Sequence, residues 1–412
     1  MIEIAKLKNG ITVITEPSGH YNSAAFGVWV RTGSKNETKE NNGISHFIEH
    51  MLFKGTSKRN TNDISRETSF LGGNVNAYTS KENTSYYART LPEYLTRAID
   101  LIGDMISGSL IDEEEMEREK SVVCEEIDMY KDSPDDYVHE MLQKHIWNSH
   151  PLGYYISGKK KTVKGFTRQE ILDYMNNYYT GENMIISVAG KINRQEAMEA
   201  IEKSFGGIRK KGRKTSACEP GYNKVYIVKK RDIEQVHLNI AFRGASLKSS
   251  DRYGYTLLNA IFGSDVNSRL FREIREKNGL TYSVYSYGSS FENAGLFHIY
   301  GAMNPEQLNK VYSIMESLIY DLVKEGVTEA ELNEAKHQLT VEMTLNRDNV
   351  MTKMTGNAKS YMNYGEIIPF RRTIKSLNNV TTEDIKRITD KYIVMEEMSV
   401  GLVGPIEKHI KL

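Results

Sequence analysis

Short apolar runs of strand length are mixed along the chain with longer stretches of helical periodicity. The strand-like runs are residues 26–31, 185–189, 238–243 and 399–403. The segments 113–129 and 332–341 contain neither glycine nor proline and predict helices. Because strands and helices do not follow a regular βαβα order, the pattern favours an α+β fold over a doubly wound parallel sheet.

The order of these elements repeats once within the chain. Residues 167–190 correspond to 381–404 at an offset of 214, and residues 26–31 correspond to 238–243 at an offset of 212. In both copies, a threonine with an acid three residues later predicts the start of a helix. A chain of 412 residues is also long for a single core. We therefore predict two homologous domains of about 200 residues, which are 1–207 and 223–412, and a linker at 208–222.

Composition and charge narrow the range of partners. Lys plus Arg and Asp plus Glu are both 54, so the formal net charge is zero and general binding to nucleic acid or anionic lipid is not expected. The basic run in the linker is interpreted as solvated chain rather than a nucleic-acid surface. No apolar stretch is long enough to predict a membrane span.

The expected compartment is the cytoplasm. The first residues show neither a secretory signal nor a transit-peptide pattern. The two cysteines, Cys124 and Cys218, lie in unlike contexts and do not indicate a disulfide framework. Cys124 follows two valines, and we expect it to be a small buried residue rather than a nucleophile.

The strongest chemical motif is the run from His46 to His50. His46, Glu49 and His50 lie at positions i, i+3 and i+4, which share one face of a helix. Neutral imidazoles are good zinc ligands, and a carboxylate on the same face can take a proton from water beside the metal. The order H-x-x-E-H is the inverted form of a known zinc-peptidase motif. Five residues alone are a moderately specific pattern.

A catalytic zinc usually takes a third protein ligand, which must come from elsewhere in the chain. Glu119 and Glu126 lie seven residues apart in the predicted acidic helix and therefore share a face. One of them can bind the metal while the other supports it from outside. Spacing alone does not choose among the acids of this helix.

With these residues in place, the chain resembles the pitrilysin family of zinc peptidases over nearly its whole length. The likeness is to the short-subunit branch, which includes the mitochondrial processing peptidase and its bacterial relatives. The resemblance implies that Glu126 is the third ligand, that Glu119 supports catalysis and that Glu49 is the general base. It also implies two α/β-sandwich domains of the LuxS/metallopeptidase-like kind.

Two further stretches carry the resemblance. Residues 72–80 resemble the family's edge strand, which implies that Asn76, Ala77 and Tyr78 bind an extended substrate as an added strand. Residues 268–282 resemble the C-terminal motif, which implies that Arg275 and Tyr282 contact substrate near the metal and that the tyrosine stabilises the oxyanion.

The second copy of the domain lacks the metal ligands. Aligning the two copies sets Leu257, Ala260 and Ile261 opposite His46, Glu49 and His50, within a residue or two. We therefore expect one Zn²⁺ per chain.

The resulting expectation is a zinc metalloendopeptidase that cleaves unfolded peptides or flexible protein segments inside a dimeric chamber. Because the chain carries both the zinc motif and the Arg275/Tyr282 pair, it can close such a chamber with a copy of itself. Two alternatives are the catalytic subunit of a heterodimeric processing peptidase and a non-catalytic assembly subunit.

Overall fold

The computed structural model describes residues 1–213 and 219–406, and these form two compact units. Of the described residues, the first unit contains 1–128, 154–213 and 346–367, and the second contains 129–153, 219–345 and 368–406. Each unit is therefore built from three separate stretches of chain. The predicted linker, 208–222, lies partly outside the described residues.

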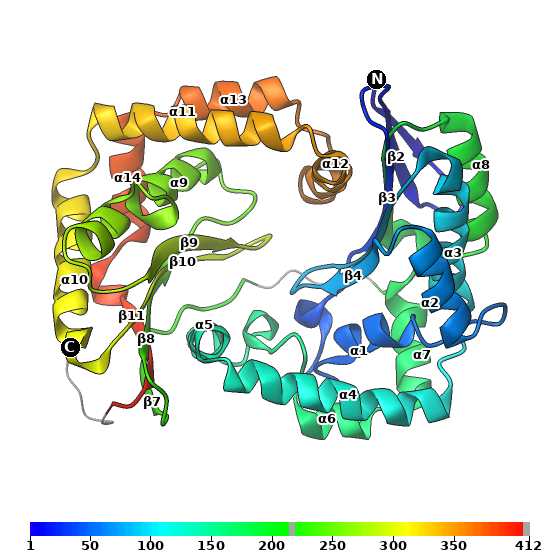
Figure 1. Ribbon diagram of the computed structural model, residues 1–412, viewed down its shortest axis with the longest axis horizontal. Helices are drawn as coiled ribbons and strands as arrows, with labels where there is room; N and C mark the ends of the chain where they lie inside the picture. Colours follow the sequence, from blue (N-terminus) through cyan, green and yellow to red (C-terminus); the bar gives the residue numbers. More distant parts are fainter. Residues whose placement is uncertain (214–218, 407–412) are drawn as a thin grey trace. The chain divides into compact units, whose positions relative to one another are not determined.

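The first unit is a six-stranded sheet with helices on both faces (Figure 1). Its strand order is β1-β2-β6-β3-β5-β4, and only the β2–β6 pair is parallel. The strands are Glu3–Lys6 (β1), Thr12–Pro17 (β2), Ala24–Val30 (β3), Val75–Thr79 (β4), Thr84–Thr90 (β5) and Met184–Gly190 (β6). The helices are Ile44–Met51 (α1), Thr61–Phe70 (α2), Leu95–Gly108 (α3), Glu113–Asp132 (α4), Lys160–Gly165 (α6), Arg168–Tyr178 (α7), Arg194–Phe205 (α8) and Val350–Tyr364 (α12), with α4 ending in the second unit.

The second unit repeats this plan with five strands in the order β7-β11-β8-β10-β9. The strands are Tyr226–Lys230 (β7), Val236–Arg243 (β8), Ser283–Ser290 (β9), Gly295–Met303 (β10) and Ser399–Gly404 (β11). The helices are Pro134–Trp147 (α5), Arg252–Asn259 (α9), Leu308–Glu325 (α10), Glu329–Asn346 (α11), Phe370–Asn378 (α13) and Thr382–Tyr392 (α14), with one residue of α11 in the first unit. The π-helical turns Ala260–Ser264 (η5) and Phe271–Glu276 (η6) follow α9.

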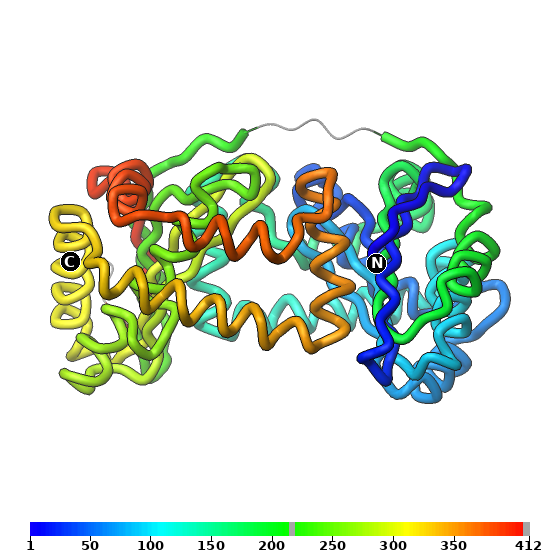
Figure 2. Tube along the Cα trace, turned by 90° about the horizontal axis from the view of Figure 1, so that it is seen from above, coloured from blue at the N-terminus to red at the C-terminus, as the bar shows by residue number. Residues whose placement is uncertain are grey.

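Each half of the sequence contributes one helix to the other half's sheet. Helix α12, which lies late in the chain, packs on β2, β3 and β6 of the first unit (Figures 1 and 2). There Met354 and Ala358 are buried against Trp29. Helix α5, which lies early in the chain, packs on β8 and β11 of the second unit. The main core of each unit lies on the opposite face of its sheet.

Most local predictions are confirmed. The four strand-like runs lie in β3, β6, β8 and β11, and the two glycine-free stretches lie in α4 and α11. Thr167 and Thr381 both accept the backbone N–H three residues later in capping boxes, and Cys124 is buried. Helix α11 packs one side on the core of the second unit, with Leu332 and Ala335 buried and Leu339 and Met343 half-buried. The predicted division into two homologous halves of the sequence stays a prediction. The two compact units do not coincide with those halves, because α5 of the first half belongs to the second unit and α12 of the second half belongs to the first.

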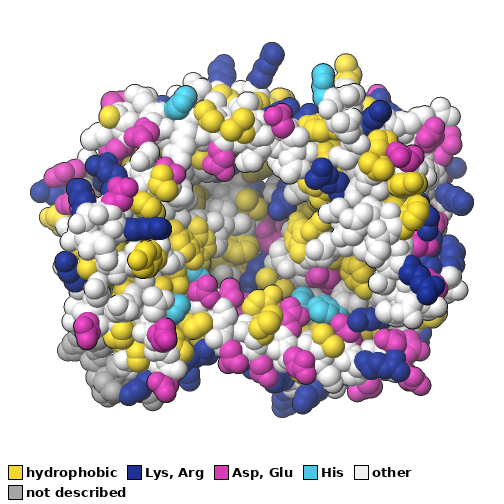
Figure 3. Space-filling view, viewed as in Figure 1, with side chains coloured by type: hydrophobic (Ala, Val, Ile, Leu, Met, Phe, Trp, Pro, Cys, Tyr) yellow, Lys and Arg dark blue, Asp and Glu magenta, His cyan; other side chains and the backbone are white. Residues whose placement is uncertain are grey.

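Charge on the visible face agrees with the balanced composition. In Figure 3, acidic and basic side chains are interspersed, and neither sign forms a continuous field. Among the described residues, no helix is both long enough and apolar enough to cross a membrane.

The exchanged helix α5 should carry a measurable share of the stability of the second unit. Leu142 is fully buried beside Ala241 and Leu296. We expect Leu142→Ala to lower the free energy of unfolding of this unit by about 2–5 kcal/mol, because it leaves a cavity in a packed cluster. Urea titration followed by tryptophan fluorescence measures this, since Trp147 lies in the same cluster. The control Leu345→Ala, at a site 65% exposed on α11, should change stability by less than about 0.5 kcal/mol.

Candidate metal centre

Helix α1 presents the motif residues on one face and buries the other. It begins after Gly43, which has a φ of 100°, and a Cβ there would lie 2.8 Å from the carbonyl oxygen of Ser157. Only glycine combines this left-handed conformation with so close an approach. Ile44, Phe47 and Ile48 anchor α1 in the core. The motif residues thus lie on one helix, as predicted.

The structure brings His46, His50 and Glu126 together as a group able to hold a metal ion. One ligand atom from each residue lies within 4.8 Å of the others. His46 Nε2 is 3.6 Å from Glu126 Oε1, and His50 Nε2 is 3.3 Å from Glu126 Oε2. Among the described residues, this is the only such group of histidines, cysteines and acids.

The donor chemistry of this group fits zinc. Two imidazoles and one carboxylate are a common set of three protein ligands at catalytic zinc sites. The two imidazole rings are already close, with centroids 4.6 Å apart. His46 Nδ1 is buried and has no hydrogen-bond partner among the described residues. An orphaned nitrogen of this kind is unfavourable unless the site around it has a further function.

Glu119 orients His50 from behind. Its Oε1 lies 2.7 Å from His50 Nδ1, and its Oε2 lies 2.5 Å from the ammonium of Lys54. Burial raises the pKa of Glu119, but the hydrogen bonds from His50 and Lys54 outweigh it and lower the pKa overall. An ionised Glu119 accepts a hydrogen bond from His50 Nδ1–H, and Nε2 of the same ring faces Glu126.

The two histidines have opposite protonation behaviour. Burial, assisted by the charge of His50, lowers the pKa of His46 to about 4 against the opposing effect of Glu126 and Glu119. Burial also lowers the pKa of His50, but its hydrogen bonds to Glu119 and Glu126 prevail and raise it to about 9. Without metal at neutral pH, the His46 ring is therefore neutral, whereas the His50 ring is protonated on both nitrogens and positively charged.

Glu49 is held by the neighbouring edge strand. The hydroxyl of Thr79, at the end of β4, donates to Glu49 Oε2 at 2.5 Å. Burial raises the pKa of Glu49, and the Thr79 hydrogen bond and the charge of His50 oppose this rise. A carboxylate with a raised pKa is better matched to accepting a proton near neutral pH than an exposed one.

Strand β4 has an open edge beside α1. Ser80 N donates to Asn83 O and Arg89 N donates to Asn74 O, so the alternation of an antiparallel ladder sets the backbone groups of Asn76 and Tyr78 toward β5. The N–H and C=O of Ala77 consequently face the open edge. The Ala77 N–H is taken by Asn76 Oδ1 at 2.8 Å.

The side chain of Tyr78 has a different role. Its phenol oxygen accepts a hydrogen bond from Trp29 Nε1 at 3.1 Å, which ties β4 to the strand at the centre of the sheet. Of the three residues predicted to bind substrate on this strand, Ala77 is the one whose backbone faces outward.

Arg275 and Tyr282 belong to the second unit and contact each other. Arg275 Nη1 donates to the carbonyl oxygen of Tyr282 at 3.0 Å, and its guanidinium also lies 4.8 Å from the ring centroid of Phe271. The Tyr282 side chain is 88% exposed, which is unusual for an aromatic residue. The two residues are therefore neighbours and the tyrosine is exposed, while their contact with substrate stays a prediction.

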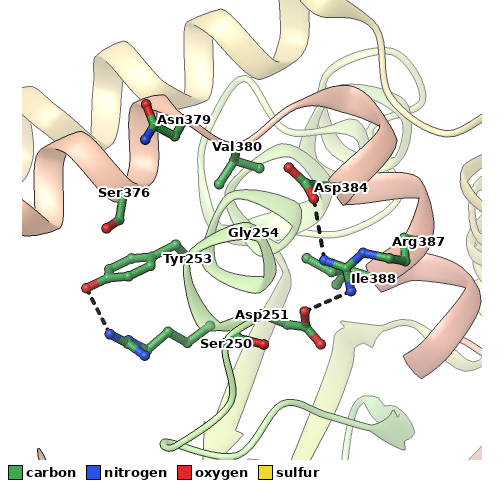
Figure 4. Close-up of a pocket in the computed structure, with 11 residues that line it drawn as sticks. Ser250, Asp251, Tyr253, Gly254, Ser376, Asn379, Val380, Asp384, Arg387 and Ile388 are labelled. Atoms are coloured by element: carbon green, nitrogen blue, oxygen red, sulfur yellow. Dashed lines mark hydrogen bonds and ion pairs between the residues drawn. The ribbon is translucent and has the colours of Figure 1, made fainter.

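The second unit has a pocket of its own at the start of α9, lined by residues of α9, α13 and α14 (Figure 4). Asp251 is 5% exposed there and binds Arg387 at 2.8 Å and Lys391 at 2.7 Å. Arg387 also contacts Asp384. Both carboxylates of this pocket are thus paired with basic side chains of α14, and the cluster joins α9 to α14.

Comparison with known proteins gives the family. A model described as insulinase (peptidase family M16) matches residues 12–160, and one described as the peptidase M16 inactive domain matches residues 165–339. The chain is 38% identical over 405 residues to the uncharacterized zinc protease YmxG of Bacillus subtilis, covering 98% of both chains. The chain belongs to peptidase family M16.

Two solved structures share the fold of this M16 chain. A protease from Helicobacter pylori aligns with a TM-score of 0.87 at 22% identity, covering 98% of this chain and 99% of that one. A protein described as a peptidase M16 inactive domain from Pseudomonas fluorescens aligns with a TM-score of 0.90 at 20% identity, covering 100% of both chains. The predicted pitrilysin family and two-domain α+β architecture are therefore confirmed.

Sequence reasoning missed two side chains of the M16 site. Thr79 lay within the edge-strand motif, but nothing in the sequence shows that its hydroxyl reaches Glu49. Lys54 lies beyond the end of α1 at Met51, so helical spacing does not place it, and the structure pairs it with Glu119.

Metal binding to the M16 centre should release about one proton per Zn²⁺ at pH 7, because His50 is protonated in the metal-free site and His46 is not. The affinity for zinc should accordingly rise with pH up to about 9. Calorimetric titration in two buffers of different ionisation enthalpy counts the protons. Binding without proton release at pH 7 would contradict the protonation states described above.

Proposed function

We propose that this chain is a zinc-dependent endopeptidase that cleaves unfolded peptides or flexible protein segments. The convergence of His46, His50 and Glu126 beside the tethered carboxylate of Glu49 is the observation that carries the proposal. The curated relatives support it, since YmxG and a Rickettsia felis protein 34% identical over 403 residues are both described as uncharacterized zinc proteases.

His46, His50 and Glu126 would hold one Zn²⁺ per chain. When bound, the ion would activate a water molecule and polarise the carbonyl of the scissile peptide bond. Glu119 keeps His50 in the tautomer that leaves Nε2 for the metal, and Lys54 holds Glu119 in place.

Glu49 acts as the general base and then as the general acid. It takes the proton of the attacking water and passes it to the nitrogen of the leaving amine. Its hydrogen bond from Thr79 fixes the direction of the carboxylate, so the proton-accepting oxygen keeps its position between turnovers.

Substrate binds as an extended strand along the open edge of β4. The outward N–H and C=O of Ala77 form main-chain hydrogen bonds with the peptide, which displaces the side chain of Asn76 from the Ala77 N–H. Main-chain pairing of this kind selects extended backbone rather than one side chain. Unfolded segments are therefore the expected substrates.

The working enzyme is proposed to be a homodimer that encloses a chamber in the cytoplasm. Arg275 and Tyr282 of one chain reach the metal centre of its partner, where the phenol stabilises the oxyanion and the guanidinium binds a substrate carbonyl or carboxylate. The exposure of Tyr282 supports this role. Peptides are the only proposed substrates, and neither nucleic acid nor a membrane takes part.

Glu49→Gln tests the base. We expect zinc content to persist, because no ligand is lost, while kcat for an unstructured peptide falls by about 10²-fold or more. The control Glu125→Gln, at an exposed position next to Glu126, should keep both properties. Elemental analysis and a quenched-fluorescence peptide assay measure the two quantities. Cleavage at the wild-type rate by Glu49→Gln would exclude this assignment.

Mixing two inactive chains tests the assembly. We expect Tyr282→Phe to reduce cleavage at least tenfold on its own, since an oxyanion donor is lost. A mixture with Glu49→Gln chains should regain roughly a quarter of the wild-type rate, because half of the dimers then contain one intact site. No rescue after confirmed subunit exchange would show that each site is built within one chain or requires a different partner.

A further inference from the structure

A buried carboxylate outside the ligand group lies at the start of the metal-binding helix. Glu37 is 3% exposed. Its Oε2 accepts hydrogen bonds from Gly43 N at 2.7 Å and from Asn42 Nδ2 at 2.8 Å, and its Oε1 accepts from Ser45 N at 2.9 Å. All three partners are donors, so both oxygens of an ionised carboxylate are used.

Helix α1 has no other cap. Its N-cap residue is Gly43, which has no side chain to accept the first backbone N–H groups. The close approach of Ser157 excludes the larger residues that usually cap a helix at this position. Glu37 supplies the missing acceptor from six residues upstream. Burial raises the pKa of Glu37, and the hydrogen bonds from Gly43, Asn42 and Ser45 oppose that rise.

The charge of Glu37 also suits the ligand that follows. Helix N-termini carry partial positive charge and favour anions, which makes them poor neighbours for a metal cation. His46 is the third residue of α1, so the metal group begins within the first turn. A carboxylate on the N–H groups of Gly43 and Ser45 offsets that positive charge.

Glu37 is itself anchored to the turn after β4. It ends the short helix Ser34–Asn36, in which Ser34 N donates to Ser80 O and Lys35 N donates to Lys81 O at 2.7 Å. Ser80 follows Thr79, whose hydroxyl binds Glu49. The end of β4 and the turn after it therefore restrain α1 at two places. The turn positions Glu37, which binds the first turn of α1, and Thr79 binds the Glu49 carboxylate.

The second unit, which lacks the candidate ligands, provides an internal comparison. Its equivalent helix, α9, also begins at a buried acid, Asp251, but this side chain makes no cap hydrogen bond. Asp251 instead pairs with Arg387 of α14 (Figure 4). It also pairs with Lys391 of the same helix. A carboxylate bound to the backbone of the first turn thus occurs in the copy that carries the ligands.

We propose that Glu37 is a positioning residue of the metal centre: its buried carboxylate caps the first turn of α1 and sets the position of His46 relative to His50 and Glu126. The proposal rests on the proposed zinc site and deepens it. Glu37 does not touch metal or substrate, and its effect passes through the backbone of Gly43 and Ser45.

Glu37→Gln tests the proposal, with Asp251→Asn as the matched control. The glutamine keeps the shape of the side chain but turns one acceptor into a donor that faces backbone N–H groups. We expect its zinc affinity, measured by chelator competition, to fall about 10- to 100-fold, as occurs when residues supporting a metal ligand are lost. The d–d absorption of the Co²⁺-substituted protein should also change. Asp251→Asn should lower the melting temperature of the metal-free protein but leave both metal readouts at wild-type values.

Glu37→Asp gives a second test, because it keeps the charge but is too short to reach both N–H groups. It should fold and bind zinc with an affinity between those of the wild type and Glu37→Gln. A lower melting temperature with wild-type zinc affinity and Co²⁺ spectrum in both Glu37 variants would overturn the positioning role. Absence of tight zinc binding in the wild-type chain would instead overturn the proposed function.

Discussion

The metal centre depends on the fixed placement of one short helix, α1. A helix of eight residues is only marginally stable by itself in water, so its position must come from contacts with the rest of the unit. Phe47 and Ile48 bury one side in the core, and Thr79 holds Glu49 on the other. The carboxylate of Glu37 completes the restraint at the first turn. These contacts fix the positions of His46 and His50, the two candidate ligands on α1, independently of a bound metal.

The charges of His50 and Glu119 around this helix each have a partner of opposite sign. Burying carboxylates and imidazoles is costly unless each charge has a partner. His50 lies between Glu119 and Glu126, and Lys54 neutralises the far side of Glu119. The proton on His50 takes the place of a cation in the metal-free protein. A bound Zn²⁺ would displace this proton and put two positive charges among the same carboxylates.

The two units share a strand order, but among the described residues only the first contains the candidate ligand group. The second unit repeats the order of five of the six strands, and a buried acid, Asp251, stands at the start of α9. Apolar residues of α9 and η5 take the positions that align with His46, Glu49 and His50. The exchange of α5 and α12 between the two halves makes each sheet depend on both halves of the sequence. In each half of the sequence, one face of the sheet is covered by a helix that comes from the other half.

The sequence by itself predicted the repeat, the strand and helix types, and the candidate ligands His46 and His50. These predictions follow from local periodicity and from spacing on a single helix, whereas spacing left Glu119 and Glu126 equivalent and only the resemblance to the family singled out Glu126. Only the tertiary structure decided the helix exchange, the outward direction of the Ala77 backbone, and the contacts of Thr79, Lys54 and Glu37. Such contacts join segments that are distant along the chain or depend on the turn of a backbone. Hydrophobic pattern fixes which face of an element is buried, but it leaves open which atoms then meet.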